Sequence, residues 1–271
     1  MKLTITAAVT AIAFTHTAAG AATVVVTTPA GVFTNNGPTN MAGPGVGFDQ
    51  WFANNVRNGG SAGITTTNPN NGNGSLAFSG PANAKADFEY YFSAPNQFLL
   101  SDLNALSYDY YRSSSSTAGS QYAPALRLSV TNGTQTGYLV YEGIYNGTPV
   151  SPVNSFIAAN TISAKFWATG SLPDAFNNYD RTLSDWTTLV PNLRVTALST
   201  GIGSGWNGSF EGAVDQITFG VAGRGTTTFN FEAGAVAAVP ETSTWLMMLV
   251  GFGMIGTTAR YRRRTTKIAY A

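Results

Sequence analysis

The 271-residue chain contains no cysteine and a single histidine, His16. Without cysteine it can form neither disulfide bonds nor thiolate metal sites. His16 falls within an N-terminal segment with the pattern of a signal peptide, so the processed chain would contain no histidine. Such a chain can build neither a Ser-His-Asp triad nor a histidine metal site. The sequence also lacks a glycine-rich phosphate loop ending in Lys-Ser or Lys-Thr, which leaves no nucleotide-binding hypothesis.

Charge is scarce as well. Charged residues make up 10% of the chain, whereas about a quarter is usual in soluble domains. Six of the 14 Lys and Arg residues lie at the two ends, and Glu241 is the only one of the 13 acids there. The central region therefore has eight basic and twelve acidic residues, a net charge of about −4. Because nucleic-acid-binding domains are basic, we expect no nucleic-acid partner.

Aromatic residues and short alternating runs are what the central sequence has in abundance. In KADFEYYF, ALSYDYYR, PALRLSV and VDQITFG the apolar residues alternate, which places them on one face of a strand. These one-face sets are Phe88, Tyr90 and Phe92; Leu106, Tyr108 and Tyr110; Leu126, Leu128 and Val130; and Ile217 and Phe219. Short strands at this spacing predict an all-β fold, an antiparallel β-sandwich or jelly roll. One short helical turn is predicted around residues 183–189, which Pro191 would end.

Four Asn-Gly pairs lie between these runs: Asn73-Gly74, Asn132-Gly133, Asn146-Gly147 and Asn207-Gly208. Asn-Gly is the preferred pair of type I′ hairpin turns, because both central residues must accept a positive φ. Each pair is followed by Ser or Thr and so also matches the N-glycosylation sequon. We interpret the four pairs as turns.

The N-terminal segment MKLTITAAVTAIAFTHTAAGAA has the three parts of a secretory signal peptide. Lys2 supplies the positive charge, residues 3–14 form the apolar stretch, and Ala19-Gly20-Ala21 fits a small-residue cleavage site. We therefore interpret residues 1–22 as a signal peptide and residues 23–234 as one β-sandwich ectodomain.

The C-terminal stretch at residues 243–259 is uncharged and close to the ~20 residues that span a bilayer. Trp245 at one end suits the membrane interface, and the arginines that follow Ala259 suit the cytoplasmic side. This pattern predicts a single short transmembrane helix over residues 243–259.

The same tail combines a Pro-Glu pair, an aromatic residue, a Gly-Phe-Gly step and an arginine cluster. These residues are Pro240, Glu241, Trp245, Gly251, Phe252, Gly253, Arg260, Arg262, Arg263 and Arg264. Together they resemble the PEP-CTERM sorting signal of Gram-negative bacteria, over residues 239–264 and with Thr242 in place of the second motif proline. The resemblance implies a membrane anchor that an exosortase, a membrane cysteine peptidase, recognises. It further implies export through the inner membrane, with the ectodomain in the periplasm, at the cell surface or in the extracellular matrix, associated with exopolysaccharide.

Sugar binding fits the central residues. Segments such as LSYDYYRSSSS resemble other PEP-CTERM exported proteins, and GSGWNGSFEGAVDQITFG also resembles the closing strand of jelly-roll glycan-binding modules. Trp and Tyr rings stack on sugar faces, and the candidates are Trp206, Trp167 and Tyr110. Trp206 is preferred, since its Gly-rich loop should expose it. Asp215 is the candidate ligand of a structural calcium ion, and no other cofactor is expected.

We thus predict an exported, C-terminally anchored cell-surface or matrix protein that binds or accompanies glycans and is not an enzyme. One alternative is a glycoside hydrolase or lyase, which needs two carboxylates about 5–10 Å apart. The carboxylates considered for it are Glu142, Glu211, Asp109 and Asp215. A second alternative is an ice- or surface-adhesion protein, in which the runs ITTT and TTTF would form a flat, exposed array of threonines.

Overall fold

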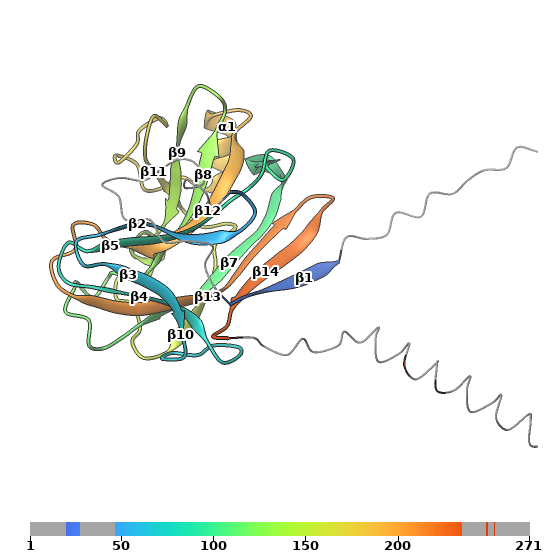
Figure 1. The fold of residues 1–271 in the computed structure, drawn as a ribbon. Helices are drawn as coiled ribbons and strands as arrows, with labels where there is room; N and C mark the ends of the chain where they lie inside the picture. Colours follow the sequence, from blue (N-terminus) through green and yellow to red (C-terminus); the bar gives the residue numbers. More distant parts are fainter. Residues whose placement is uncertain (1–19, 28–46, 235–247, 249–251, 253–271) are drawn as a thin grey trace, which may run out of the picture. The chain divides into compact units, whose positions relative to one another are not determined.

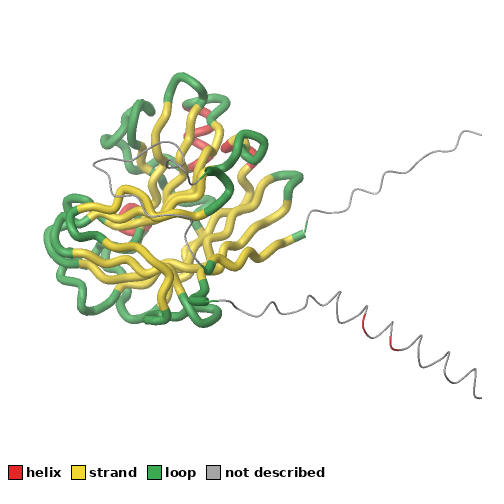
Figure 2. The backbone as a smooth tube through the Cα atoms, viewed as in Figure 1, coloured by secondary structure: helices red, strands yellow, loops and turns green. Residues whose placement is uncertain are grey.

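Two seven-stranded β-sheets form most of the chain that the structure, a computed structural model, describes (Figure 1). The described residues are 20–27 and 47–234, together with Met248 and Phe252. All strand pairs are antiparallel except one, and helix is confined to short pieces (Figure 2). The prediction of an all-β, mostly antiparallel sandwich is confirmed.

The first sheet, sheet A, is organised around its longest strand, β13. β4 pairs with the first half of β13, β14 pairs with the second half, and β7 lies along the other side. β1 extends the sheet beyond β14 as its one parallel strand. The strands of sheet A are β1 (Ala21–Val26), β3 (Ser61–Thr65), β4 (Ser75–Gly80), β7 (Leu103–Arg112), β10 (Phe156–Asn160), β13 (Phe210–Val221) and β14 (Gly225–Phe231).

The second sheet, sheet B, has the order β11-β9-β8-β12-β5-β2, with β6 paired to β12 beside β5. Its strands are β2 (Trp51–Arg57), β5 (Lys85–Tyr91), β6 (Phe98–Leu99), β8 (Ala125–Thr131), β9 (Thr136–Tyr141), β11 (Trp167–Ala168) and β12 (Arg194–Ile202). Three short helices connect strands: η1 (Leu100–Asp102), η2 (Gly143–Asn146) and α1 (Leu183–Leu189).

The core lies between the inner faces of the two sheets, and aromatic rings from both sheets meet there. Trp51 of β2 stacks on Phe88 of β5 at 5.5 Å between ring centroids and meets Phe231 of β14 edge-on at 5.3 Å. Each predicted one-face set lies on this inner side, from Phe88 on β5 to Ile217 on β13. The alternation therefore predicts correctly which side chains face the core, because shifting a strand by one residue would turn its apolar set to the outer face.

The predicted helical turn is α1, which spans Leu183–Leu189. Thr182 caps its N-terminus, and the Asp185 side chain bonds back to the Thr182 backbone N–H, so two unpaired donors are satisfied. Leu183 and Trp186 bury their side chains against the sandwich. Pro191 follows the C-cap Val190, as the sequence predicts.

The type I′ assignment of the four Asn-Gly pairs is wrong. None of the four asparagines has a positive φ, and among the glycines Gly74 does not have one either. Asn132 lies in the β8–β9 hairpin, where its Oδ1 accepts the backbone N–H groups of Thr134 and Gln135. Gly147, at φ 83°, ends the helix η2 instead of closing a hairpin. In the β8–β9 hairpin Gly133, at φ 90°, takes the left-handed conformation, whereas Asn132 bonds its own loop through its side chain.

The predicted segments at the two ends lie largely outside the described residues. The signal-peptide boundary after residue 22 falls inside β1, because Ala21 and Ala22 pair with Thr226 and Thr227 of β14. Of the predicted transmembrane segment 243–259, only Met248 and Phe252 are described. In the part of the chain that is described, no helix has the length and apolar character needed to cross a membrane.

Candidate functional site

The outer face of sheet B, which faces away from the core, carries a row of charged residues that are nevertheless buried. On β5, Lys85, Asp87 and Glu89 alternate with the core residues Ala86 and Phe88, so the three charged side chains share the outer face. Their exposed fractions are only 9%, 3% and 1%. Charged residues are almost never fully buried unless they are paired, so these three side chains must have partners nearby.

These residues line a cavity of about 510 Å³, here called the outer cleft. Strands β2, β5, β8, β9, β11 and β12 form its floor, and residues after β11 and after β12 form parts of its rim. The residues that matter for its chemistry are Asn55, Arg57, Lys85, Asp87, Glu89, Arg127, Tyr138, Glu142, Trp167 and Phe176. The cavity volume falls within the ~300–1,000 Å³ typical of small-molecule sites.

Asp87 is the centre of a buried charge network. Its carboxylate accepts from Lys85 Nζ and Arg127 Nη1, both at 2.6 Å, and from Asn55 Nδ2 at 2.9 Å. Burial favours the neutral acid, but the Lys85 and Arg127 charges outweigh it and hold the pKa of Asp87 below its usual value. Burial lowers the pKa of Lys85 to about 8, and the positive charge of Arg127 acts in the same direction. The negative charge of Asp87 opposes both effects but is outweighed. The network therefore holds fixed donors and a fixed carboxylate at the floor of the cleft.

Glu89 lies two residues beyond Asp87 on the same face of β5, and its pKa is shifted in the opposite direction. Burial, and next the negative charge of Asp87, raises its pKa to about 7. Its carboxyl group accepts from Asn54 Nδ2 at 2.7 Å and from the Tyr138 hydroxyl at 3.1 Å. Asp87 and Glu89 are thus neighbouring carboxyl groups whose pKa values are shifted in opposite directions, down at Asp87 and up at Glu89.

Aromatic side chains form the other end of the outer cleft. Trp167 of β11 is half-buried, and its indole N–H donates to Glu142 Oε2 at 3.0 Å, which fixes the ring plane. Phe176 and Tyr179 lie beside it at 5.7 and 6.0 Å between ring centroids, and Phe176 is 59% exposed. Burial raises the pKa of Glu142. A half-exposed indole next to an exposed phenyl ring offers a hydrophobic surface to a ligand.

Two polar atoms of the outer cleft have no hydrogen-bond partner among the residues that the structure describes. They are Asn55 Oδ1 and Arg57 Nη1, and both atoms are shielded from solvent. Burying a polar atom without a partner costs about 1–3 kcal/mol. A bound molecule with its own donors and acceptors would satisfy both atoms.

Of the three predicted sugar-stacking residues, only Trp167 has a partly exposed ring. The prediction that the Gly-rich loop exposes Trp206 is wrong, since the side chain is 9% exposed and stacks on Tyr122 at 4.7 Å. Its backbone C=O accepts the Asn83 N–H at 2.9 Å, and the indole also meets Phe210 edge-on at 5.0 Å, so the ring packs inside the loop. Tyr110, at 3% exposure, packs beside Tyr108 in the core and does not line the outer cleft. Trp206 is nonetheless one of the residues that line the outer cleft.

Two of the predicted carboxylates, Asp109 of β7 and Asp215 of β13, are directly paired across sheet A, but the four acids do not meet in the outer cleft. Among the four acids considered for hydrolysis, only Glu142 lines the outer cleft. Glu211 bonds to the Ser115 hydroxyl, and Asp109 accepts from Asn70 Nδ2 at 2.9 Å. Glu211 and Asp109 are thus each hydrogen-bonded to a neighbouring side chain outside the outer cleft.

Asp215, the candidate calcium ligand, is buried within sheet A. Its two oxygens accept from the Phe231 backbone N–H at 2.9 Å and from Gln216 Nε2 at 3.3 Å. Burial raises its pKa to about 6. No cluster of three or more metal-binding side chains occurs within residues 20–27 and 47–234. The arrangement thus gives no support to a calcium site at Asp215.

Sequence reasoning missed most of the outer cleft. Lys85, Asp87 and Glu89 are visible in KADFEYYF as the polar half of the alternation, but that half ordinarily faces water. The segment PALRLSV, which forms β8 on the other side of β12 from β5, carries a related signal, because Arg127 alternates there with leucines as the acids do with aromatics. Phe176 and Tyr179 lie in a polar loop with no periodic signal.

No protein-family model matches the chain, and no curated protein matches it significantly. Several solved structures are similar in shape. One is the family 11 carbohydrate-binding module from Clostridium thermocellum in complex with a β-1,3-1,4-mixed-linked tetrasaccharide, with a TM-score of 0.35, 12% identity, and coverage of 68% of this chain and 91% of the module. Another is the non-crystalline-cellulose-specific carbohydrate-binding module CBM28, with a TM-score of 0.31 and 14% identity. The match covers 58% of this chain and 79% of that module. With TM-scores below 0.5, these likenesses carry no weight for this chain's ligand, which has to follow from its own residues.

Proposed function

We propose that this chain is a glycan-binding protein and that the outer cleft is its binding site. The observation that carries the proposal is the pairing, within one cavity, of an aromatic end with a floor of fixed polar groups. A sugar has an apolar face of C–H groups and a rim of hydroxyls. Both halves of that chemistry are matched in the outer cleft.

The aromatic end would hold the sugar ring. Trp167 is oriented by its hydrogen bond to Glu142, so little side-chain freedom is lost when a ring stacks on it. Phe176 extends the hydrophobic surface toward solvent, where a longer glycan chain would continue. Stacking of this kind contributes about 0.5–1.5 kcal/mol beyond the area buried.

The polar floor would select among hydroxyls. Asn55 Oδ1 and Arg57 Nη1 are an unpaired acceptor and an unpaired donor, which complement the two roles of a hydroxyl group. Asp87 and Arg127 are held by one another, so they keep their positions when the ligand leaves. A site with such buried polar groups rejects ligands that lack the matching hydroxyls.

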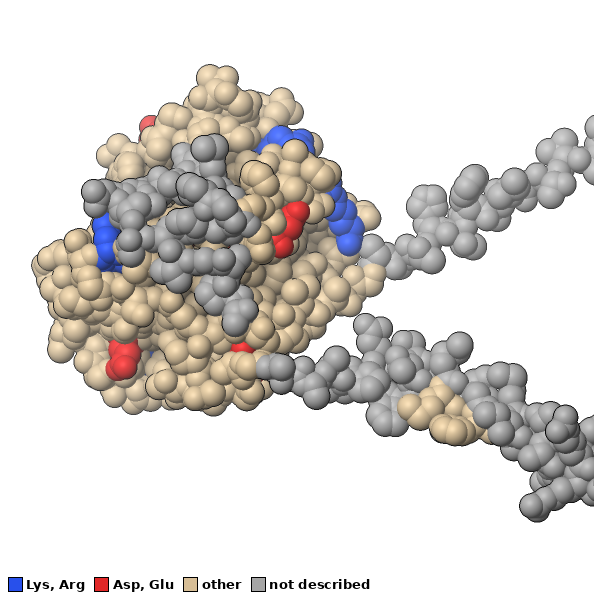
Figure 3. Space-filling model, viewed as in Figure 1, with Lys and Arg blue, Asp and Glu red and all other residues tan. Residues whose placement is uncertain are grey.

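We further propose that binding takes place outside the inner membrane. The support is the signal-peptide pattern of residues 1–22 and the resemblance of residues 239–264 to the PEP-CTERM sorting signal. An exosortase would then be a partner, and exopolysaccharide the glycan within reach. The charged residues that line the outer cleft are balanced in sign, Arg57, Lys85 and Arg127 against Asp87, Glu89 and Glu142, which suits a neutral polymer. On the face that Figure 3 shows, charged groups are few and scattered.

The adhesion alternative has less support. In the TTTF run, Thr226, Thr227 and Thr228 are all half-buried, and Thr227 lines a cavity on the inner side of β14. The run therefore does not present a flat, exposed row of threonines.

The test is an array of neutral and acidic oligosaccharides probed with the purified full chain, followed by titration of the best ligand. Trp167→Ala should weaken binding by at least about tenfold, the equivalent of 1.4 kcal/mol. Phe156→Ala is the matched control, because Phe156 is a half-buried aromatic on β10 of the other sheet and packs on Tyr111. Equal losses in both variants, or binding to no glycan on the array, would refute the assignment.

A further inference from the structure

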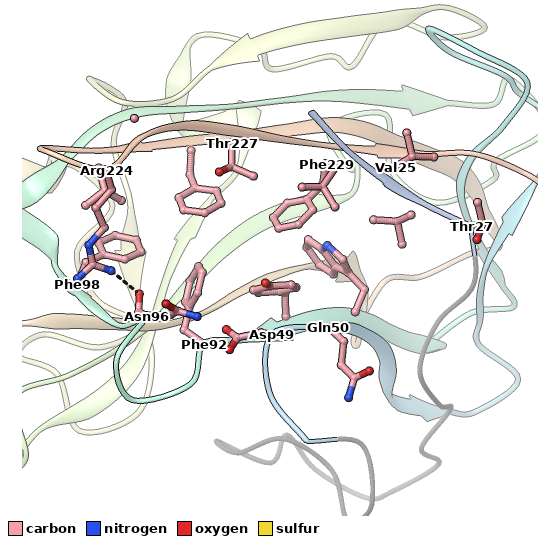
Figure 4. A pocket seen from close by; sticks show the side chains of 17 residues that line it. Val25, Thr27, Asp49, Gln50, Phe92, Asn96, Phe98, Arg224, Thr227 and Phe229 are labelled. Atoms are coloured by element: carbon pink, nitrogen blue, oxygen red, sulfur yellow. Dashed lines mark hydrogen bonds between the residues drawn. The ribbon is translucent and has the colours of Figure 1, made fainter. Parts of the chain in front are cut away.

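A second cavity lies between the two sheets, at the edge where they separate. It has a volume of about 620 Å³ and is here called the inter-sheet cleft (Figure 4). Strands β1, β13 and β14 of sheet A form one wall, and β2, β5 and β6 of sheet B form the other. It shares no lining residue with the outer cleft, so what it binds is independent of the glycan proposal.

Its walls are a continuous set of aromatic rings from both sheets. Phe229 of β14 lies 4.9 Å from Tyr90 and 5.2 Å from Trp51, between ring centroids. Phe219 of β13 lies 5.5 Å from Phe92, the residue that follows β5. The rings face the cavity because the sheets diverge here and the core is left unfilled at its edge (Figure 4). Walls of this kind favour a ligand whose flat faces can stack on them.

Trp51 supplies an unused donor in this wall. Its side chain is 3% exposed, and its indole Nε1 has no hydrogen-bond partner among the residues that the structure describes. Buried indole N–H groups usually have an acceptor, as Trp186 does in the Phe166 carbonyl at 2.9 Å. The missing partner of Trp51 therefore points to a ligand atom, and that atom must be an acceptor.

The rim of the inter-sheet cleft has one charge of each sign. Arg224 donates to the Asn96 carbonyl at 3.0 Å, shown as a dashed line in Figure 4. Asp49 accepts the Ser93 N–H at 3.1 Å, and its pKa lies below the usual value because its hydrogen bonds to Ser93 and Asn96 outweigh the effect of burial. A rim with balanced charges does not favour an anionic head group over a neutral one.

We propose that the inter-sheet cleft binds a flat, uncharged aromatic or conjugated molecule that carries an oxygen acceptor. The ring system stacks between the aromatic walls, and the acceptor oxygen receives the Trp51 Nε1–H. The volume of the cleft accommodates a fused ring system of two or three rings.

The experiment uses 2-naphthol and naphthalene, which share one ring system and differ in the oxygen. Binding to the full chain in lipid nanodiscs is measured at pH 7 by equilibrium dialysis, with empty nanodiscs subtracted. One hydrogen bond corresponds to about a two- to tenfold preference for 2-naphthol. In Trp51→Phe this preference for 2-naphthol should disappear, while naphthalene still binds.

Two substitutions on adjacent residues of β14 locate the site. Thr227 faces the cavity and Thr226 faces the other side of the sheet, so Thr227→Phe should abolish binding of both probes and Thr226→Phe should leave it unchanged. 1-Decanol, an uncharged alkyl chain with the same kind of acceptor, should bind more weakly than 2-naphthol. The proposal is overturned if neither probe binds, if 1-decanol binds better, if the Thr227→Phe and Thr226→Phe variants behave alike, or if the preference for 2-naphthol survives in Trp51→Phe.

Discussion

Replacing Trp206 with Ala tests whether its ring is part of the core. The side chain is 9% exposed, stacks on Tyr122 at 4.7 Å and meets Phe210 edge-on at 5.0 Å. A buried Trp→Ala substitution costs about 3–5 kcal/mol, because it removes apolar burial and leaves a cavity. For a domain of this size 1 kcal/mol corresponds to ~2–4 °C in Tm. We therefore expect Trp206→Ala to lower Tm by roughly 6–20 °C.

The assay is thermal unfolding of the full chain followed by near-ultraviolet circular dichroism, which reports aromatic packing. Phe176→Ala is the control, since that ring is 59% exposed and its removal should shift Tm by no more than about 2 °C. A Trp206→Ala variant that melts within 2 °C of the wild type would mean that the indole is not packed as described. The stacking on Tyr122 would then be refuted with it.

Three further outcomes are expected. Glu89→Gln should raise the free energy of unfolding at pH 8 by on the order of 2–3 kcal/mol, because the folded protein prefers the protonated acid. This gain should vanish as the pH falls from about 7 toward 4.5, and urea unfolding across that range measures it. Arg127→Met leaves the buried Asp87 with one cation fewer and should cost about 3–5 kcal/mol, whereas the exposed pair of Lys165 and Asp180 should contribute less than ~1 kcal/mol in the same assay. Deleting residues 240–271 should move the protein from the membrane fraction to the periplasm or medium, and Thr242→Pro should increase tail removal where an exosortase is present; soluble, unprocessed full-length protein would contradict the anchor.

The strands could be predicted because their signal is local. In KADFEYYF the alternation alone places Phe88 on the core face and Glu89 on the opposite face of β5, and the structure has both so. Helix α1 could be predicted for the same reason, because its capping residues Thr182 and Asp185 and the terminating Pro191 lie within ten residues of one another.

The site could not be predicted in the same way, because it depends on which strands become neighbours. Asp87 on β5 and Arg127 on β8 lie on either side of β12 and are far apart in the sequence. No spacing rule connects them. The error at Trp206 has the same origin: a Gly-rich loop on the surface is a sound expectation, but the partner ring, Tyr122, comes from a distant segment.

The pairing of β1 with β14 has a consequence for how the protein is made. Ala21 and Thr226 are partners, so the first strand of the fold has to wait for the last one. Contacts between such distant residues close large loops and form slowly. Sheet A therefore remains incomplete until residues 225–231 have been synthesised. If the N-terminal region leads the chain across a membrane, β1 reaches the far side first and stays unpaired until the final strand arrives. An unpaired apolar strand is an aggregation hazard, which makes the interval between the emergence of β1 and that of β14 the vulnerable stage of biogenesis.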